Sequence, residues 1–129
     1  MRKFSGLAFG LVAMAVAGSA IAGYRAGSTV FINSASRVFV GTVSTTRNSP
    51  DATQYLQIQH SANSSSEYVA FAARDASGNF ATCYSYAAPI ISAAKAVLSD
   101  SHLQVNYDTS GVCTSVTVFN SSWSPPKNP

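Results

Sequence analysis

The fold is decided by the stretch CYSYAAPIISAAKAVLSDSHLQVNYDTSGVC, which runs from Cys83 to Cys113 and holds both cysteines of the 129-residue chain. Two cysteines in an exported chain most simply form one disulfide bond. Such a bond would close a loop of 31 residues, counting both ends, and would stabilise the fold by roughly 3 to 4 kcal/mol on the chain-entropy estimate. The alternative is a reactive thiol, which would need a neighbouring cation or a helix start to favour the thiolate.

Between the cysteines, the sequence predicts a short helix followed by a strand hairpin. Pro89 suits the first turn of a helix, where its missing N–H costs nothing, and apolar residues follow it at helical spacing as far as Leu98. Alternation then predicts a strand at His102–Tyr107, a turn, and a returning strand at Val112–Phe119. The same alternation places Cys113 on the face opposite to the valines that follow it.

Upstream of Cys83, the chain is predicted to form strands and turns. Four segments rich in β-branched and aromatic residues predict strands: Thr29–Ile32, Arg37–Val43, Tyr55–His60 and Glu67–Arg74. Gly41 interrupts the second of them and predicts a bulge or tight bend. The segment Phe80–Tyr86 fits either a further strand or a structured loop. Aspartates between these segments are interpreted as turn residues.

The N-terminus has the layout of a secretory signal peptide. Arg2 and Lys3 precede an apolar run over residues 7–17, and the small-residue triplet Ala20-Ile21-Ala22 follows. A membrane anchor is the competing interpretation, but the apolar run is too short to span a bilayer. We therefore expect residues 1–22 to be removed and the protein to be secreted or periplasmic, with no membrane span.

The remaining chain, residues 23–129, is nearly neutral. It carries six basic and five acidic residues, scattered singly along the sequence. Nucleic-acid binding would require clustered Lys and Arg, so it is not expected. The length fits one β domain at residues 23–120, followed by an irregular tail at residues 121–129 that is rich in Pro and Asn.

No catalytic or metal-binding motif is present. His60 and His102 fall in separate predicted strands without a carboxylate or cysteine at ligand spacing, and no G-x-S-x-G motif occurs. We predict no catalytic residue, no metal site and no cofactor. Six tyrosines and Trp123, set among hydroxyl and amide side chains, suit a polar-ligand site, although such rings also commonly line the edge of a core.

The predicted order of strands, one helix and a final strand pair is similar to that of an OB-fold. The predicted fold class is mainly β with one short helix, in a small OB-like five-stranded barrel. Among exported OB-folds, the chain resembles the B subunits of the subtilase-cytotoxin and typhoid-toxin group. The resembling pieces are Val40–Val43, Tyr55–Ile58, the Ser-rich loop at residues 61–66, Pro89–Leu98 and Leu103–Tyr107.

The resemblance implies a pentameric ring that binds sialylated glycans on host cells. It implies sugar contacts by Ser28, Tyr24 and Ser66, while Ala62 and Asn63 stand where the family has a basic residue. We therefore predict a secreted, non-enzymatic binding protein whose partners are a glycan or cell-surface protein and further copies of itself. Two alternatives remain: a small periplasmic structural or accessory protein without a ligand, and a secreted enzyme with an unrecognised site.

Overall fold

The computed structural model describes residues 26–126 and 128, so the predicted signal peptide and Tyr24 lie outside the described residues. Over the described part, the chain forms seven strands and two helices. They are β1 (Phe31–Asn33), β2 (Val38–Thr42), α1 (Val43–Arg47), β3 (Tyr55–Ala62), β4 (Glu67–Arg74), β5 (Phe80–Ser85), α2 (Ala88–Lys95), β6 (His102–Tyr107) and β7 (Cys113–Phe119). No helix in this part is long and apolar enough to cross a membrane.

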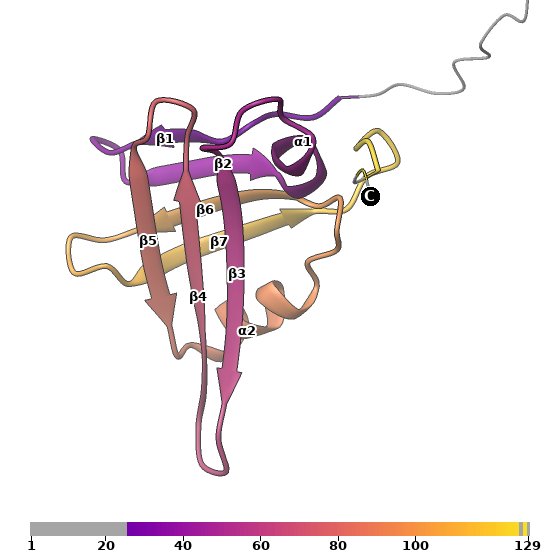
Figure 1. Cartoon of the computed structure of the whole chain (residues 1–129). Coiled ribbons are helices and arrows are strands. Elements are labelled where there is room, and N and C mark those ends of the chain that lie inside the picture. The colour runs from indigo at the N-terminus through magenta and orange to yellow at the C-terminus, as the bar shows by residue number, and fades with distance from the viewer. Residues whose placement is uncertain (1–25, 127, 129) are drawn as a thin grey trace, which may run out of the picture.

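The strands form two antiparallel sheets. One has four strands in the order β1-β2-β6-β7, and the other has three in the order β3-β4-β5. Figure 1 shows the two sheets as layers whose strands run in clearly different directions, with the β3–β4 hairpin extending beyond the body. The prediction of a mainly β fold is confirmed.

The predicted five-stranded barrel is wrong. The seven described strands lie in two sheets that do not close on each other. The sheets meet at one corner, where Tyr84 forms an isolated parallel bridge with Val112 and the Tyr84 N–H donates to the Gly111 carbonyl at 3.0 Å. No pairing between β1 and β3 joins the other side. After β2 the chain turns into α1, so β3 pairs with its hairpin neighbour β4 instead of continuing the first sheet.

The core lies between the two sheets. Alternation along β4 turns Val69, Phe71 and Ala73 inward, where they are buried against Phe39 and Val105 of the other sheet. This follows directly from the period of two that the sequence shows. The strand that was ambiguous, Phe80–Ser85, buries alternate residues in the same way.

The sequence predicted a bulge or tight bend at Gly41. In the structure this residue is instead a point of close approach between the sheets. It pairs regularly with Leu103 in the adjacent strand. A Cβ at this position would lie 2.9 Å from the Leu56 Cδ1 atom of the opposite sheet. A side chain here would have to displace the flexible end of Leu56, so the glycine allows the two sheets to approach each other closely at this point.

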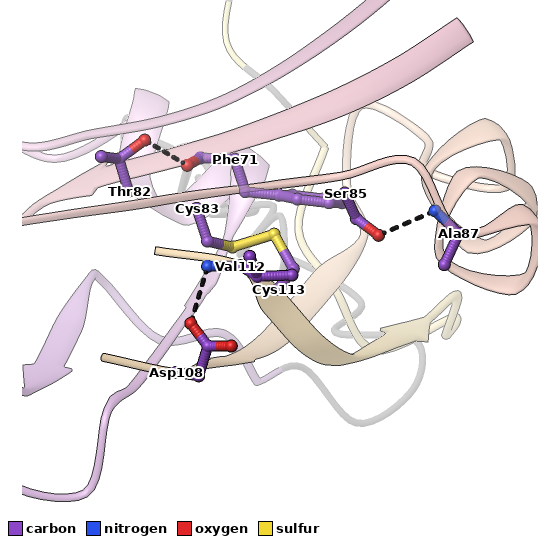
Figure 2. The surroundings of a disulfide bond; sticks show 8 residues. All are labelled: Phe71, Thr82, Cys83, Ser85, Ala87, Asp108, Val112 and Cys113. Carbon is purple, nitrogen blue, oxygen red and sulfur yellow. Dashed lines mark hydrogen bonds between the residues drawn. A yellow bond between two sulfur atoms is a disulfide. The ribbon is translucent and has the colours of Figure 1, made fainter. Parts of the chain in front are cut away.

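The predicted disulfide is present and joins the two sheets. Cys83 on β5 is bonded to Cys113 on β7, and both residues are buried (Figure 2). The prediction that Cys113 lies on the face opposite to Val116 and Val118 is wrong, because the register of β6 and β7 shifts at Asn106/Tyr107 and leaves Thr114 as an extra residue. Such a bulge reverses the alternation and turns Cys113 into the core.

Aspartates organise two of the turns, as predicted. Asp108 Oδ1 accepts the N–H groups of Ser110 and Val112. Asp75 Oδ1 accepts the N–H of Asn79 in the β4–β5 turn. Gly78 and Gly111 have φ of 85° and 78° in these turns, which glycine adopts without strain.

The predicted helix at residues 89–98 is confirmed as α2 but ends earlier, at Lys95. Ile91 and Ala94 are its buried residues, whereas Leu98 lies beyond the helix and is 57% exposed. A second helix, α1, was not predicted: its first residue, Val43, was assigned to a strand. Ser44 and Thr46 of α1 are buried, and their hydroxyl groups have no hydrogen-bond partner within the described part of the chain.

Replacing Thr46 by valine should therefore stabilise the protein. Thr46 is 4% exposed, and an unpaired buried hydroxyl costs about 1 to 3 kcal/mol that the isosteric methyl group would not. We expect Thr46→Val to raise the free energy of unfolding by about 1 kcal/mol in urea titrations. Thr53→Val, at an exposed turn, is the control and should change it by less than about 0.5 kcal/mol. A destabilised Thr46→Val protein would show that the hydroxyl is satisfied.

Candidate functional site

A cleft of about 620 Å³ opens on the outer face of the four-stranded sheet. Its lining comes from the segment before β1, from β2, β6 and β7, and from the C-terminal tail. The lining residues are Ala26, Gly27, Ser28, Thr42, His102, Gln104, Phe119 and Trp123. Strand pairing places Thr42 opposite His102, and His102 opposite Phe119. The floor of the cleft is therefore a row of side chains from three neighbouring strands. Patterns of residues that are close in sequence do not reveal such a row.

Two hydroxyl groups hold the His102 ring. The Thr42 Oγ1 lies 3.0 Å from His102 Nδ1, and the Ser28 Oγ lies 3.4 Å from the same nitrogen. The segment before β1 is fixed against β2, because the Ser28 N–H donates to Thr42 Oγ1 at 3.1 Å and the Thr42 N–H donates to the Ser28 carbonyl at 2.8 Å. Backbone pairing thus positions both hydroxyls.

The His102 imidazole is neutral at physiological pH. Burial lowers the pKa of His102 below its ordinary value of 6.5, since desolvation disfavours the charged ring. Both hydroxyl groups lie near Nδ1, where they can donate to an unprotonated nitrogen or accept from a protonated one. Nε2 has no hydrogen-bond partner among the described residues and can contact a ligand in either role.

The lowered pKa of His102 predicts a loss of stability in mild acid. The unfolded chain takes up the proton first as pH falls, so the stabilising contribution is present above the ordinary pKa of 6.5 and declines below it. Thermal unfolding between pH 7.5 and 5 should show this decline. The fall in Tm between these two pH values should be smaller in His102→Gln than in the control His60→Gln, which retains His102. Equal pH dependence in the two variants would contradict the assignment.

Two aromatic side chains form the wall of the cleft. Phe119 and Trp123 are 44% and 47% exposed, and the Phe119 ring lies 5.7 Å from the His102 ring between centroids. The tail that carries Trp123 is fastened at several points. The Trp123 carbonyl accepts the Ala26 N–H at 2.9 Å. Asn48, after α1, donates to the Pro126 carbonyl at 3.0 Å and accepts the Asn128 N–H at 2.7 Å.

The chemistry of the cleft suits hydrogen bonding to an uncharged polar molecule. None of the described side chains that line it is charged at neutral pH. Ser28 and His102 could be compared with a nucleophile and its base, but a competing hydroxyl, that of Thr42, lies closer to the same nitrogen. No carboxylate hydrogen-bonds to His102 within the described residues, so none of these residues supplies the third group that orients a catalytic base.

The structure separates two of the three predicted ligand residues, Ser28 and Ser66. Ser28 lines the cleft, whereas Ser66 lies in the β3–β4 loop, where Asn63 Oδ1 accepts its N–H at 2.9 Å. That loop and the C-terminal end lie at opposite ends of the molecule in Figure 1. Tyr24 is outside the described residues. Sequence reasoning missed Thr42, His102, Gln104 and Phe119 as site residues, and it gave Trp123 only a general role.

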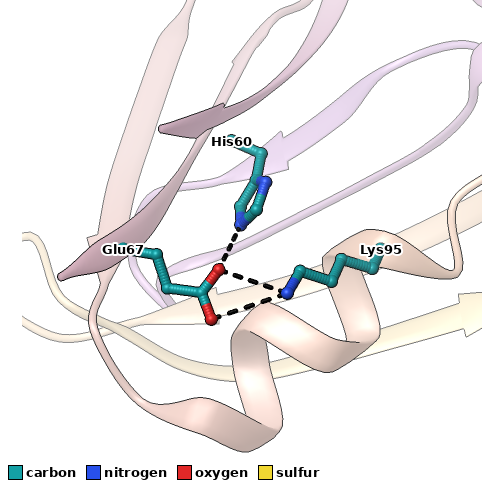
Figure 3. A network of polar contacts seen from close by, with 3 residues as sticks. All are labelled: His60, Glu67 and Lys95. Carbon is teal, nitrogen blue, oxygen red and sulfur yellow. Dashed lines mark hydrogen bonds and ion pairs between the residues drawn. The ribbon is translucent and has the colours of Figure 1, made fainter. Parts of the chain in front are cut away.

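A second polar cluster joins the β3–β4 hairpin to α2 (Figure 3). Glu67 Oε2 lies 3.0 Å from His60 Nε2 and 3.2 Å from Lys95 Nζ. The hydrogen bond from Lys95, followed by that from His60, lowers the pKa of Glu67. All three residues are exposed or nearly so, and no hydroxyl or thiol of the described chain hydrogen-bonds to His60. The cluster is a surface ion-pair network of small energetic weight.

The tyrosines that the structure describes divide between the core and the three-stranded sheet. Tyr107 packs on Phe39 with ring centroids 6.1 Å apart. Tyr68, Tyr84 and Tyr86 form a ring cluster on the three-stranded sheet, with centroids 5.6 and 6.1 Å apart. No tyrosine lines the cleft in the described part of the chain. No group of three or more potential metal-ligating side chains occurs there either.

Comparison of the chain with protein-family models, with curated proteins and with solved structures found no match. The resemblance to toxin B subunits stays a prediction. Function must therefore be argued from the site itself.

Proposed function

We propose that this protein is a secreted, non-enzymatic glycan-binding module and that the cleft on the four-stranded sheet is its site. One observation carries the proposal: two half-exposed aromatic rings, Phe119 and Trp123, stand beside the polar groups of Ser28, His102 and Gln104. A sugar ring has an apolar C–H face and a rim of hydroxyl groups, so it matches a site of this composition.

The cleft is also preorganised. Ser28, Thr42 and His102 are held by the hydrogen bonds between the first described segment and β2, and the Trp123 segment is fastened to Ala26. Binding a ligand would therefore order few additional side chains, which lowers the entropic cost of association.

Removal of the Trp123 ring should abolish most of the binding. We expect Trp123→Ala to weaken glycan affinity by about 2 kcal/mol, or roughly thirtyfold, because an aromatic anchor typically dominates such a site. Glycan arrays would identify a ligand and isothermal titration calorimetry would measure the change. Tyr86→Ala, an exposed ring on the other sheet, is the matched control and should bind normally. Binding by neither protein would favour an accessory protein without a ligand.

Export and self-association complete the proposal. The buried disulfide between Cys83 and Cys113 supports an oxidising compartment, and the N-terminal pattern of the sequence supports cleavage after Ala22. A ring of several copies, as in toxin B subunits, would give avidity to individually weak sugar sites. The mass of the exported chain in solution tests this arrangement, and a monomer at high concentration would contradict it.

A further inference from the structure

The geometry of the cleft also indicates which sugars it takes. Resting on the proposed function, we propose that the cleft selects uncharged sugars that carry an acetamido group and discriminates against the carboxylate of sialic acid. This departs from the sialylated ligands that the resemblance implies.

The first step of the argument is the charge of the lining. The eight lining residues that the structure describes include no Lys or Arg, and the one titratable side chain among them, His102, is neutral. Among the described residues, the side chains of Ser28, Thr42 and Phe119 contact His102, and none of these is charged. A carboxylate that entered this half-buried site would lose hydration without gaining an ion pair. Uncharged ligands escape that penalty.

The second step concerns the acetamido group. It presents an N–H, a carbonyl and a methyl group within a few bonds of each other. Gln104 lines the cleft with a carboxamide that makes no hydrogen bond to the described residues and can both donate and accept. Phe119 and Ala26 supply apolar surface in the same cleft. A sugar with a hydroxyl group in place of the acetamido group would leave part of this apolar surface uncovered. It would also leave the donor or the acceptor of the Gln104 carboxamide without a partner.

A matched ligand pair isolates the effect of charge. The methyl glycoside of N-acetylneuraminic acid and its methyl ester share every group except the ionised carboxylate. Titration calorimetry with the exported chain at pH 7.5 should show the ester binding roughly tenfold more tightly than the acid. The methyl glycosides of N-acetylglucosamine and glucose test the second step, and the first should bind roughly tenfold more tightly.

A cation placed in the cleft should reverse the preference. Gln104→Arg adds a positive charge on an exposed strand position and should make the acid the tighter ligand of the sialoside pair. Gln57→Arg adds the same charge on the exposed face of β3, in the other sheet, and should leave the preference for the ester unchanged.

The outcomes separate the two proposals. Equal affinity for acid and ester in the unaltered protein, or tighter binding of the acid, would overturn the selectivity while leaving sugar binding in place. Equal affinity for the two neutral glycosides would overturn the role of the acetamido group. Failure of all four ligands and of a glycan array would instead overturn the proposed function itself.

Discussion

Loss of the disulfide should lower the free energy of unfolding by roughly 3 to 4 kcal/mol, because Cys83 and Cys113 are 30 positions apart and their bond restricts the unfolded chain. For a domain of about 100 residues, this corresponds to a fall in Tm of roughly 15 to 25 °C. The bond also ties β5 to β7 across the corner where the sheets meet, so its loss should loosen that corner first.

The measurement is thermal unfolding of Cys83→Ala/Cys113→Ala beside the unaltered protein with and without reductant. Alanine is the preferred replacement because both sites are buried, and serine would add hydroxyl groups that need partners. The reduced protein and the double variant should agree closely. A change of less than about 1 kcal/mol would show that the link contributes little to stability.

Truncating Phe71 should be at least as damaging. Phe71 is 1% exposed at the middle of β4, between Ile58 on β3 and Cys83 on β5. Phe71→Ala should cost about 3 to 5 kcal/mol, since it removes a buried ring and leaves a cavity between the sheets. Urea unfolding would measure the change.

Phe31→Ala is the matched control for this truncation. Phe31 is 58% exposed on the edge strand β1, so its loss should change stability by less than about 0.5 kcal/mol. Equal losses in the two variants would contradict the assignment of the core. Because Phe71 and Cys83 are cross-strand partners, combining this change with loss of the disulfide should not be additive.

Local periodicity predicted most of the strands. The bounds of Glu67–Arg74 and His102–Tyr107 were obtained from alternation alone, and the disulfide followed from the count of cysteines. These features depend on residues close in sequence or on simple pairing, which is why they could be predicted. Helix α1 could not, because Val43 and its neighbours have β-branched or hydroxyl side chains that disfavour an isolated helix.

The arrangement of the sheets and the make-up of the site depended on distant contacts. The barrel was predicted because the order of elements is similar to that of an OB-fold, but the order of elements along the chain does not reveal which strand edges pair. The bulge at Thr114, which turns Cys113 inward, is likewise visible only in the register of β6 and β7. Thr42, His102 and Phe119 become neighbours through two strand pairings, which the sequence does not reveal. Of the residues that line the cleft, only Ser28 had been predicted as a ligand contact, from the resemblance to toxin B subunits.

The attachment of the last residues to Asn48 and Ala26 has a practical consequence. Every strand is complete by Phe119, yet the indole of the cleft arrives four residues later. A protease that cut after Asn120 would leave all seven strands in the chain and remove the indole that lines the cleft. If the cleft binds sugar as proposed, one hydrolysed peptide bond would therefore end binding without removing any strand.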